Sequence, residues 1–523
     1  MPCMVKNYQW IEEHLWNKNL NQSQMTAKIL KLIGVFTACI FSLKSIGQQV
    51  GVFDSHDDVG AVLHKGSANY NEATHSYQLT GSGGNIWFTH DEFQFAWKKM
   101  KGDFILQTRG TLLGAGAEAH RKFGWMIRTS LDSTSAMVCA ALHGNGLTSL
   151  QYRKSPKTNV EEVPFSDKAP DVIELERRGK QFIMSVAHFG ETYTTAQVSD
   201  IDLGDEVYVG LFVCSHNKDL TEAASFDNVR IITPAKPDFV PYRDYIGSHI
   251  ETMDVSTGQR EIIYTSPVSL QAPNWMIDGR SLIYNSNGLI YKLDLKKLSP
   301  EIVNTDTVKR NNNDHVLSFD GKMLGLSSGD GKYNSIVYTV ASTGGVPKRI
   351  TPVGPSYLHG WSPDKKFLVY TAERGDGNYD IYKIPSSGGQ EIRLTTAEGL
   401  DDGPEYSPDG KYIYFNSVRG GNMQIWRMNS DGTNQVQLTS DEFNNWFPHI
   451  SPDGKWMVFI SYPKEVKPAD HPFYKHVYLR LMPVGYGQPK VIAYVYGGQG
   501  TMNTPSWSPD GKKIAFVSNS EIK

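Results

Sequence analysis

Residues 361–370 read WSPDKKFLVY, and this pattern of an apolar residue, a tight turn and an apolar strand occurs six times in the second half of the chain. The related segments are WMIDGRSLIY (275–284), SFDGKMLGL (318–326), YSPDGKYIYF (406–415), ISPDGKWMVF (450–459) and WSPDGKKIAF (507–516). Their turn aspartates stand at positions 278, 320, 364, 409, 453 and 510, so the spacings are 42, 44, 45, 44 and 57 residues. Repeats of this length, each rich in short strands, predict the four-stranded blades of a β-propeller.

The last repeat stops after its second strand, at Phe516-Val517-Ser518. Its blade therefore needs outer strands from another part of the chain. Two strand-like segments, SHIETMDV and QREIIYT, lie within residues 248–265, just before the first repeat. We expect these segments to complete the sixth blade, which would close a six-bladed ring over residues 243–523.

These repeats resemble the Ser-Pro-Asp-Gly repeats of TolB-type propellers across residues 243–523. The resemblance implies the fold but says little about function, because propellers of this kind serve binding proteins, peptidase accessory domains and lyases. TolB itself has a different N-terminal domain, so a role in the Tol-Pal system does not follow from the resemblance.

Residues 48–233 contain no such repeat but show many short alternating strand patterns, which predict an antiparallel β-sandwich and an all-β protein. The run VGLFVCSHN (209–217) followed by ASFDNVRI (224–231) resembles the last strands of concanavalin-like lectin and glucanase jelly rolls. That resemblance implies sugar binding on a curved sheet face. The candidates for stacking on or bonding to a saccharide are Trp87, Trp97, Trp125, Tyr152 and His143. Core packing is the alternative role for the aromatic residues, and the proline-rich segment 234–242 is the expected linker.

The N-terminus carries one apolar stretch, LIGVFTACIFSL at 32–43, which is too short to span a bilayer as a helix. Lysines precede it and Ser45-Ile46-Gly47 follows it, as in a secretory signal peptide cleaved before Gln48. We therefore interpret residues 1–47 as an upstream extension and signal peptide, with lipoprotein processing at Cys39 as an alternative. The expected location is the periplasm or the cell surface, with no transmembrane segment in the mature chain.

The overall charge argues against a nucleic-acid partner. The 523 residues include 52 Lys and Arg against 55 Asp and Glu, for a formal charge of −3. A chain without basic excess lacks the usual driving force for phosphate binding. After processing, the chain keeps only Cys139 and Cys214, which either form a disulfide or remain buried thiols.

Residues that break the symmetry of the repeat mark a candidate site. Five positions before the turn aspartate, four repeats have proline, whereas two adjacent repeats have His315 and His359. We expect these positions to begin the innermost strands, at the mouth of the channel. Nearby are His449, Asp314, Asp402 and Glu405, and an insertion at 461–474 would bring Lys464, Asp470 and His471 to the same opening.

Three converging histidines with carboxylates are suited to a divalent metal ion. His315, His359 and His449 are the candidate ligands, and Glu405, Asp402 and His471 are the candidate acid or base residues. The arrangement resembles oligogalacturonate lyases, which use a histidine cluster to hold a metal. Those lyases have seven blades, however, and their full ligand set is not matched here. The alternative is that these side chains fill a polar, water-filled channel and hydrogen-bond within it.

Three functions are compatible with the sequence. The sequence favours an exported binding protein for a carbohydrate or an envelope partner, without a required cofactor. The second is a metal-dependent polysaccharide lyase or glycoside hydrolase, and the third is a protein-interaction scaffold. Binding predicts a wide polar channel with separated histidines, whereas catalysis predicts side-chain nitrogens that converge within a few ångströms. The candidate ligand-binding residues are Trp87, Trp125, His143, Tyr152, Tyr357, Trp446 and Asn503.

Overall fold

The computed structural model describes residues 49–485 and 487–522. This part of the chain is built of strands and turns with no α-helix, and residues 50–523 form one compact unit. The predicted upstream extension and signal peptide, together with the lipoprotein alternative at Cys39, lie outside the described residues. Within the described residues, no helix has the length and hydropathy required to cross a membrane.

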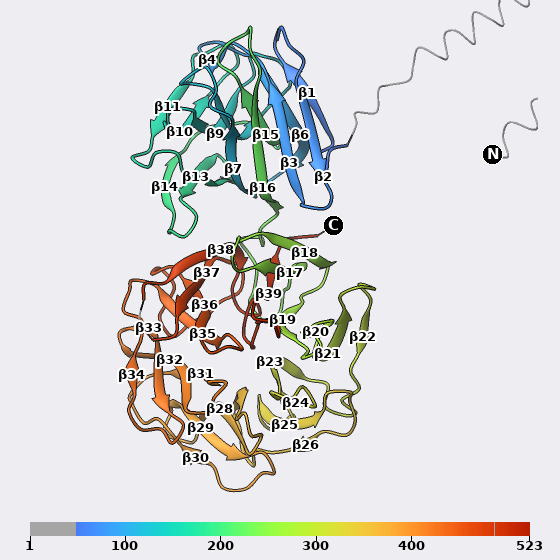
Figure 1. Cartoon of the computed structure of the whole chain (residues 1–523), viewed down its shortest axis with the longest axis vertical. Coiled ribbons are helices and arrows are strands. Elements are labelled where there is room, and N and C mark those ends of the chain that lie inside the picture. Colours follow the sequence, from blue (N-terminus) through green and yellow to red (C-terminus); the bar gives the residue numbers. More distant parts are fainter. Residues whose placement is uncertain (1–48, 486, 523) are drawn as a thin grey trace, which may run out of the picture. The chain divides into compact units, whose positions relative to one another are not determined.

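Two seven-stranded antiparallel sheets make up the N-terminal half (Figure 1). They share one hydrophobic core, to which the first sheet contributes Trp125 and Leu211 and the second contributes Leu106 and Leu175. The first sheet, in spatial order, contains β1 (Ser55–Val59), β6 (Phe93–Lys101), β15 (Glu206–Cys214), β8 (Lys122–Arg128), β9 (Met137–His143), β10 (Thr148–Arg153) and β11 (Glu161–Pro164). The second contains β14 (Thr194–Val198), β13 (Gln181–Ala187), β12 (Val172–Arg178), β7 (Phe104–Leu113), β16 (Glu222–Ile232), β3 (Ser76–Gly81) and β2 (Ser67–Asn71).

The outer face of the first sheet, opposite the shared core, is also covered. A short hairpin of β4 (Ile86–Trp87) and β5 (His90–Asp91) accompanies a second apolar cluster that includes Met126 and Cys139. Cys139 and Cys214 are both buried free thiols. Burial raises the pKa of Cys139 to about 12 and that of Cys214 to about 11, so both are inert at neutral pH.

The C-terminal half is a six-bladed ring, as the repeats predict (Figure 1). Five blades have four antiparallel strands each, and their bounds are β19 (Gln271–Trp275), β20 (Ser281–Ser286), β21 (Leu289–Asp294), β22 (Pro300–Ile302); β23 (Asn311–Leu317), β24 (Met323–Ser328), β25 (Ile336–Ala341), β26 (Lys348–Arg349); β27 (Ser356–Trp361), β28 (Phe367–Glu373), β29 (Tyr379–Pro385), β30 (Ile392–Arg393); β31 (Asp401–Tyr406), β32 (Tyr412–Gly420), β33 (Asn422–Asn429), β34 (Val436–Gln437); and β35 (Asn444–Ile450), β36 (Trp456–Tyr462), β37 (Lys475–Pro483), β38 (Lys490–Gly497).

The Ser-Pro-Asp-Gly motif forms the turn between the first and second strands of a blade. In the fourth blade the Ser407 hydroxyl donates to Asp409 Oδ1 (2.7 Å) and accepts from the Tyr412 backbone N–H (3.0 Å). Gly410 has a φ of +73°, in the left-handed region that glycine adopts without strain. The motif recurs because these local bonds satisfy the turn without help from the rest of the fold.

The sixth blade closes the ring with both ends of the propeller segment. The strand β17 (Ser248–Asp254) pairs with β18 (Arg260–Ser266) on one side and with the C-terminal β39 (Lys513–Asn519) on the other. A β-bridge between Trp507 and Ile514 continues the blade toward the axis. This confirms the predicted closure by residues 248–265.

Candidate functional site

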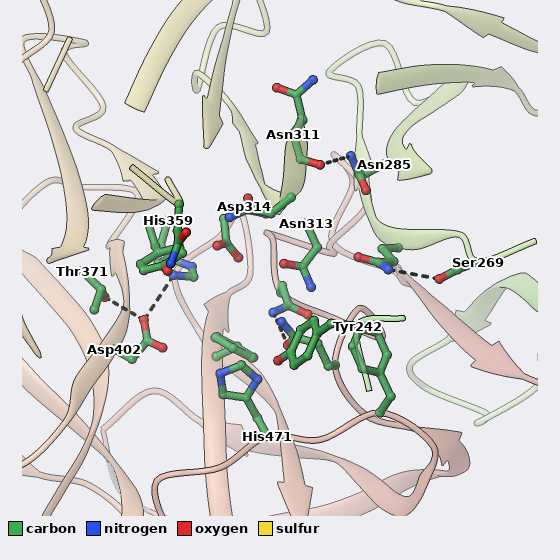
Figure 2. A pocket seen from close by; sticks show the side chains of 18 of the residues that line it. Tyr242, Ser269, Asn285, Asn311, Asn313, Asp314, His359, Thr371, Asp402 and His471 are labelled. Carbon is green, nitrogen blue, oxygen red and sulfur yellow. Dashed lines mark hydrogen bonds and ion pairs between the residues drawn. The ribbon is translucent and has the colours of Figure 1, made fainter. Parts of the chain in front are cut away.

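A pocket of about 710 Å³ opens on the propeller axis where the innermost strands begin (Figure 2). The described residues that line it include neither lysine nor arginine. The lining contains two carboxylates and two histidines. Most of its other side chains are carboxamides or aromatic rings. The pocket is thus polar and aromatic, with no fixed positive charge to attract an anionic ligand.

Nine carboxamides line the pocket: Asn285, Asn287, Asn311, Asn312, Asn313, Asn334, Asn503, Gln271 and Gln499. Some are fixed by the fold, since Asn285 Nδ2 donates to the Asn311 carbonyl (3.1 Å) and Asn311 Nδ2 donates to the Gly288 carbonyl (2.8 Å). Others have unused capacity, because Asn313 Nδ2 and Asn311 Oδ1 are buried without a hydrogen-bond partner. Buried polar atoms normally find partners, so these two are suited to a bound ligand.

Aromatic side chains surround the amides. Tyr242 and Tyr245 both pack edge-on against Phe473, at ring-centroid distances of 5.4 and 5.6 Å. Tyr357 lies beside Tyr379 across the pocket lining, with ring centroids 6.4 Å apart. Faces and edges of this kind give apolar contact area to a ligand while phenol groups remain available for hydrogen bonds.

The pocket contains a buried ion pair between His359 and Asp402 (Figure 2). Their Nε2 and Oδ1 atoms are 3.2 Å apart, and the same oxygen accepts from the Thr371 hydroxyl (2.7 Å). Burial alone would lower the pKa of His359, but the carboxylates of Asp314 and Asp402 outweigh it and hold the pKa above its usual value. Burial likewise opposes ionisation of Asp402, and His359 reverses this and lowers the pKa of Asp402. Each partner therefore favours the charged form of the other.

Asp314 is the second carboxylate of the pocket and has no such counter-ion in direct contact. Its side chain is buried, and burial raises its pKa to about 6. The positive charge of His359 lowers this pKa and the negative charge of Asp402 raises it, both by less than burial does. Asp314 thus changes its protonation state near neutral pH.

The three candidate metal ligands do not converge. His449 uses both ring nitrogens on the protein, through Glu405 Oε2 (2.6 Å) and the Met502 carbonyl (3.1 Å). His315 is fully buried without a hydrogen-bond partner for either ring nitrogen, and burial lowers its pKa to about 4. Among the described residues, no three potential ligands at the channel have their ligand atoms within 4.8 Å of one another. Only His359 of the three lines the pocket.

Bulges in the innermost strands separate residues that the repeat alignment treats as equivalent. In β23 the pairing register shifts between Asn311 and His315, whereas in β27 it shifts between Leu358 and Gly360, at His359 itself. A bulge redirects the side chains that follow it. The expectation that these positions begin the strands was also wrong, because β23 begins at Asn311 and β35 begins at Asn444.

Glu405 lies outside the central pocket. It lines a smaller cavity of about 250 Å³ near the ends of the innermost strands, beside proline and tryptophan residues such as Trp507. One Glu405 oxygen bonds to His449, and the other accepts from the Ile450 backbone N–H (3.0 Å). The structure therefore shows Glu405 in a structural network that joins two blades.

The insertion at 461–474 contributes to the pocket as expected. His471 and Phe473 line it, and the His471 ring packs edge-on against Trp446 at 4.4 Å. Lys464 instead pairs with Glu442 at an exposed position. Asn503 and Tyr357 line the pocket, whereas Trp446 is fully buried in a core cluster and does not.

The sandwich candidates lie in four different environments. Trp125 is fully buried in the shared core. His143 is buried, bonds through Nδ1 to the backbone of Leu147 (2.9 Å), and has its pKa lowered by burial to about 3. Tyr152 donates to Glu161 (3.0 Å) at the sheet edge, and Trp87 is half-buried on the covering hairpin. The structure does not bring these four residues into one pocket.

Two groups of pocket residues were absent from the sequence-based candidates. Tyr242 and Tyr245 belong to or follow the expected linker, where aromatic residues in PYRDYIG were the available signal. The run Asn311-Asn312-Asn313 was a second signal, because three amides in a row are unusual at the start of a buried strand.

The fold and the axial pocket define the protein as a six-bladed β-propeller with a ligand-sized polar site. Residues 359–470 match the family model described as TolB beta propeller domain. The uncharacterized protein Atu1656 of Agrobacterium fabrum is 44% identical over 271 residues, which cover 52% of this chain and 92% of that protein. The structure of the putative TolB from Agrobacterium tumefaciens is 43% identical, with a TM-score of 0.51, and covers 53% of this chain and 100% of that one. The chain therefore belongs to the TolB-like β-propeller family.

The resemblance of residues 243–523 to TolB-type propellers is thus confirmed. An oligogalacturonate lyase in complex with manganese shares 16% identity at a TM-score of 0.35, covering 53% of this chain and 97% of that one. At this level the similarity says nothing about chemistry.

Proposed function

We propose that this chain is an exported, noncatalytic binding protein that holds its ligand in the central pocket of the propeller. The observation that supports this most directly is the pocket lining, in which nine carboxamides and six aromatic rings occur without lysine or arginine among the described residues. Such a lining recognises a ligand through hydrogen bonds and ring stacking rather than through charge attraction.

The chemistry of the lining favours a neutral saccharide. Each sugar hydroxyl donates and accepts hydrogen bonds, and a carboxamide offers both roles in one side chain. Asn313 and Asn311 each have a buried side-chain atom without a hydrogen-bond partner. Tyr357 and Phe447 line the same pocket with their aromatic rings. An acidic oligosaccharide fits poorly, because the titratable acids and bases among the described lining residues are two aspartates and two histidines, without lysine or arginine.

A segment of an envelope protein is the second candidate ligand. Its peptide groups would use the same carboxamides, and the similarity to TolB supports it: residues of this chain are 33% identical over 60 positions to the Tol-Pal system protein TolB of Francisella tularensis subsp. mediasiatica. That match spans 12% of this chain and 14% of TolB, so it supports a shared propeller segment only.

The alternative of a metal-dependent lyase or hydrolase has less support. Its proposed ligands His315 and His449 lie outside the pocket, and its proposed acid Glu405 is bonded to His449. Asp402 and His471 remain in the pocket, but Asp402 is already paired with His359 and Thr371. The concanavalin-like assignment of residues 48–233 also stays a proposal, supported by the two sheets around one core.

A glycan array followed by calorimetry on the full chain tests the proposal. We expect a neutral oligosaccharide to bind and Tyr357→Ala or Asn313→Ala to weaken binding at least about tenfold, the loss of one stacking or bidentate contact. Trp87→Ala on the sandwich is the matched control and should bind as the wild type does. Turnover of the oligosaccharide, or equal loss in the control, would contradict the proposal.

A further inference from the structure

A second cluster of chemically active side chains lies where the sandwich meets the fifth blade. Val172 and Ala187 of the sandwich pack there against Val491 and Tyr494 of the blade, within the compact unit formed by residues 50–523. The next strand position, Ile173, points into the sandwich core. Alternate residues of β12 therefore point outward, toward the blade.

Two of these outward residues are carboxylates that lie against a histidine of the blade. Glu174 and Glu176 are only 2% and 5% exposed, although both are acidic. His476 of β37 brings Nε2 to 3.2 Å from Glu174 Oε1 and 3.8 Å from Glu176 Oε2. One ligand atom from each of the three residues lies within 4.8 Å of the other two. Among the described residues, this is the one group of three potential ligands with this spacing.

The two carboxylates of this cluster share one guanidinium as their permanent positive charge. Both oxygens of Glu176 accept from the Arg178 guanidinium, at 2.7 and 2.9 Å. Glu174 accepts from the neutral Gln107 amide at 2.6 Å and otherwise faces only the imidazole. Two buried carboxylates beside a single guanidinium require a further positive charge, because an uncompensated buried carboxylate is costly. Either a protonated His476 or a bound cation would supply it.

Two polar atoms in and beside the cluster have no hydrogen-bond partner. His476 Nε2 is buried and has no hydrogen-bond partner, although a carboxylate oxygen is 3.2 Å away. Gln107, which is 95% buried and holds Glu174 in place, also has an unpartnered Oε1. Buried polar atoms that lack a partner, next to two carboxylates, have capacity left to bind a further group.

We propose that Glu174, Glu176 and His476 bind a divalent transition-metal ion such as Zn²⁺, which connects the sandwich to the propeller. Two ligand atoms at about 2.1 Å from a tetrahedral ion are about 3.4 Å apart, close to the two nitrogen–oxygen distances observed. One imidazole and two carboxylates suit Zn²⁺ or Mn²⁺. Gln107 and Arg178 orient the two carboxylates as outer partners do in metal sites. Water molecules would complete the coordination of the ion.

This proposal is independent of the pocket ligand and is tested without one. Tag-free full-length protein is stripped with EDTA, dialysed against Zn²⁺ and analysed for metal content, and Co²⁺ is titrated while its visible spectrum is recorded. We expect about one ion per chain, a Co²⁺ spectrum of a four- or five-coordinate site, and a higher Tm with the ion bound.

Two variants at the site and two controls complete the test. His476→Ala and Glu174→Gln should lose the ion and the metal-dependent rise in Tm, while His359→Ala in the pocket and the exposed His90→Ala should keep both. Circular dichroism and size-exclusion chromatography identify any variant that fails to fold. A metal-free wild type, which would make the cluster an imidazolium ion pair, overturns the proposal. Loss of the ion in His359→Ala with retention in His476→Ala overturns it as well.

Discussion

The outer face of the sandwich's first sheet and the central pocket of the propeller both contain buried polar side chains, but only the first provides partners for them. On the sheet face, Asp91 accepts from the Arg153 guanidinium at 2.7 and 2.8 Å and lies 3.4 Å from Arg128, with all three side chains fully buried. Lys122 is buried too and donates to Asn85 at 2.9 Å. In the pocket, Asn313 and Asp314 lack such partners. Polar groups that satisfy one another stabilise the fold, whereas unsatisfied ones mark a place for a ligand.

The largest effect is expected from Asp91→Ala. Removing this carboxylate leaves two buried guanidiniums without a counter-ion and should cost about 3–5 kcal/mol of unfolding free energy. Urea unfolding followed by circular dichroism measures it. The control is Asp57→Ala, which removes an exposed acceptor of the Trp97 indole and should change little. Equal midpoints for the two variants would show that the sheet face is not held closed by Asp91.

Asp314→Asn should have a smaller effect of opposite sign. A carboxyl whose native pKa is about 6, against an ordinary 3.8, binds more protons in the native state between those values. The free energy of unfolding that this carboxyl contributes therefore falls as the pH rises above about 4. The loss reaches about 3 kcal/mol at neutral pH. The asparagine variant should be more stable than the wild type at pH 7.5 and similar at pH 4. Unfolding at both pH values measures this.

The exposed Asp306→Asn serves as the control for this pH series, since its side chain is in water. Parallel stability curves for Asp314→Asn and the wild type would contradict the account of Asp314 as a buried group without a direct counter-ion.

Asn313→Leu should separate stability from binding. It removes an amide whose Nδ2 is buried without a partner, so the ligand-free protein should gain about 1 kcal/mol while ligand binding is lost. Differential scanning calorimetry of the ligand-free protein, paired with calorimetric titration of the ligand, measures both. A destabilised variant would place Asn313 among the residues that hold the fold.

The smallest effect is expected from Tyr152→Phe at the edge of the first sheet. Its hydroxyl donates only to Glu161, at a solvent-exposed position. Removing it should change the unfolding free energy by less than about 0.5 kcal/mol and leave oligosaccharide binding unchanged. Weaker binding in this variant would move the sugar site from the propeller to the sandwich.

The blades could be predicted from the sequence because the turn that defines them is local. Ser407, Asp409 and Gly410 satisfy their own hydrogen bonds and dihedral angles within a few residues, so the motif is visible without tertiary information. Closure of the ring was predictable for a related reason, since a blade with two strands needs two more. The two sheets of the sandwich followed from strand alternation, but which sheet face would be covered did not.

The site was harder to predict because it depends on bulges and on long-range packing. His315 and His359 occupy the same position of the repeat, yet a different bulge in each strand brings only His359 into the pocket. Trp446 is buried while its neighbour Phe447 reaches the pocket, where the register again shifts. One extra residue in a strand changes the face on which a side chain lies, and no pattern in the repeat reports it.

The closure of the sixth blade also governs when the propeller can be finished. The strand β39 is made after the five four-stranded blades, yet it pairs with β17, which is made before them. The ring of blades therefore cannot close until β39 has been synthesised. Contacts between such distant segments slow folding, and the same closure means that unfolding from either end of the propeller segment must first break the sixth blade. A deletion of the last ten residues would leave an open arc with an exposed edge prone to association.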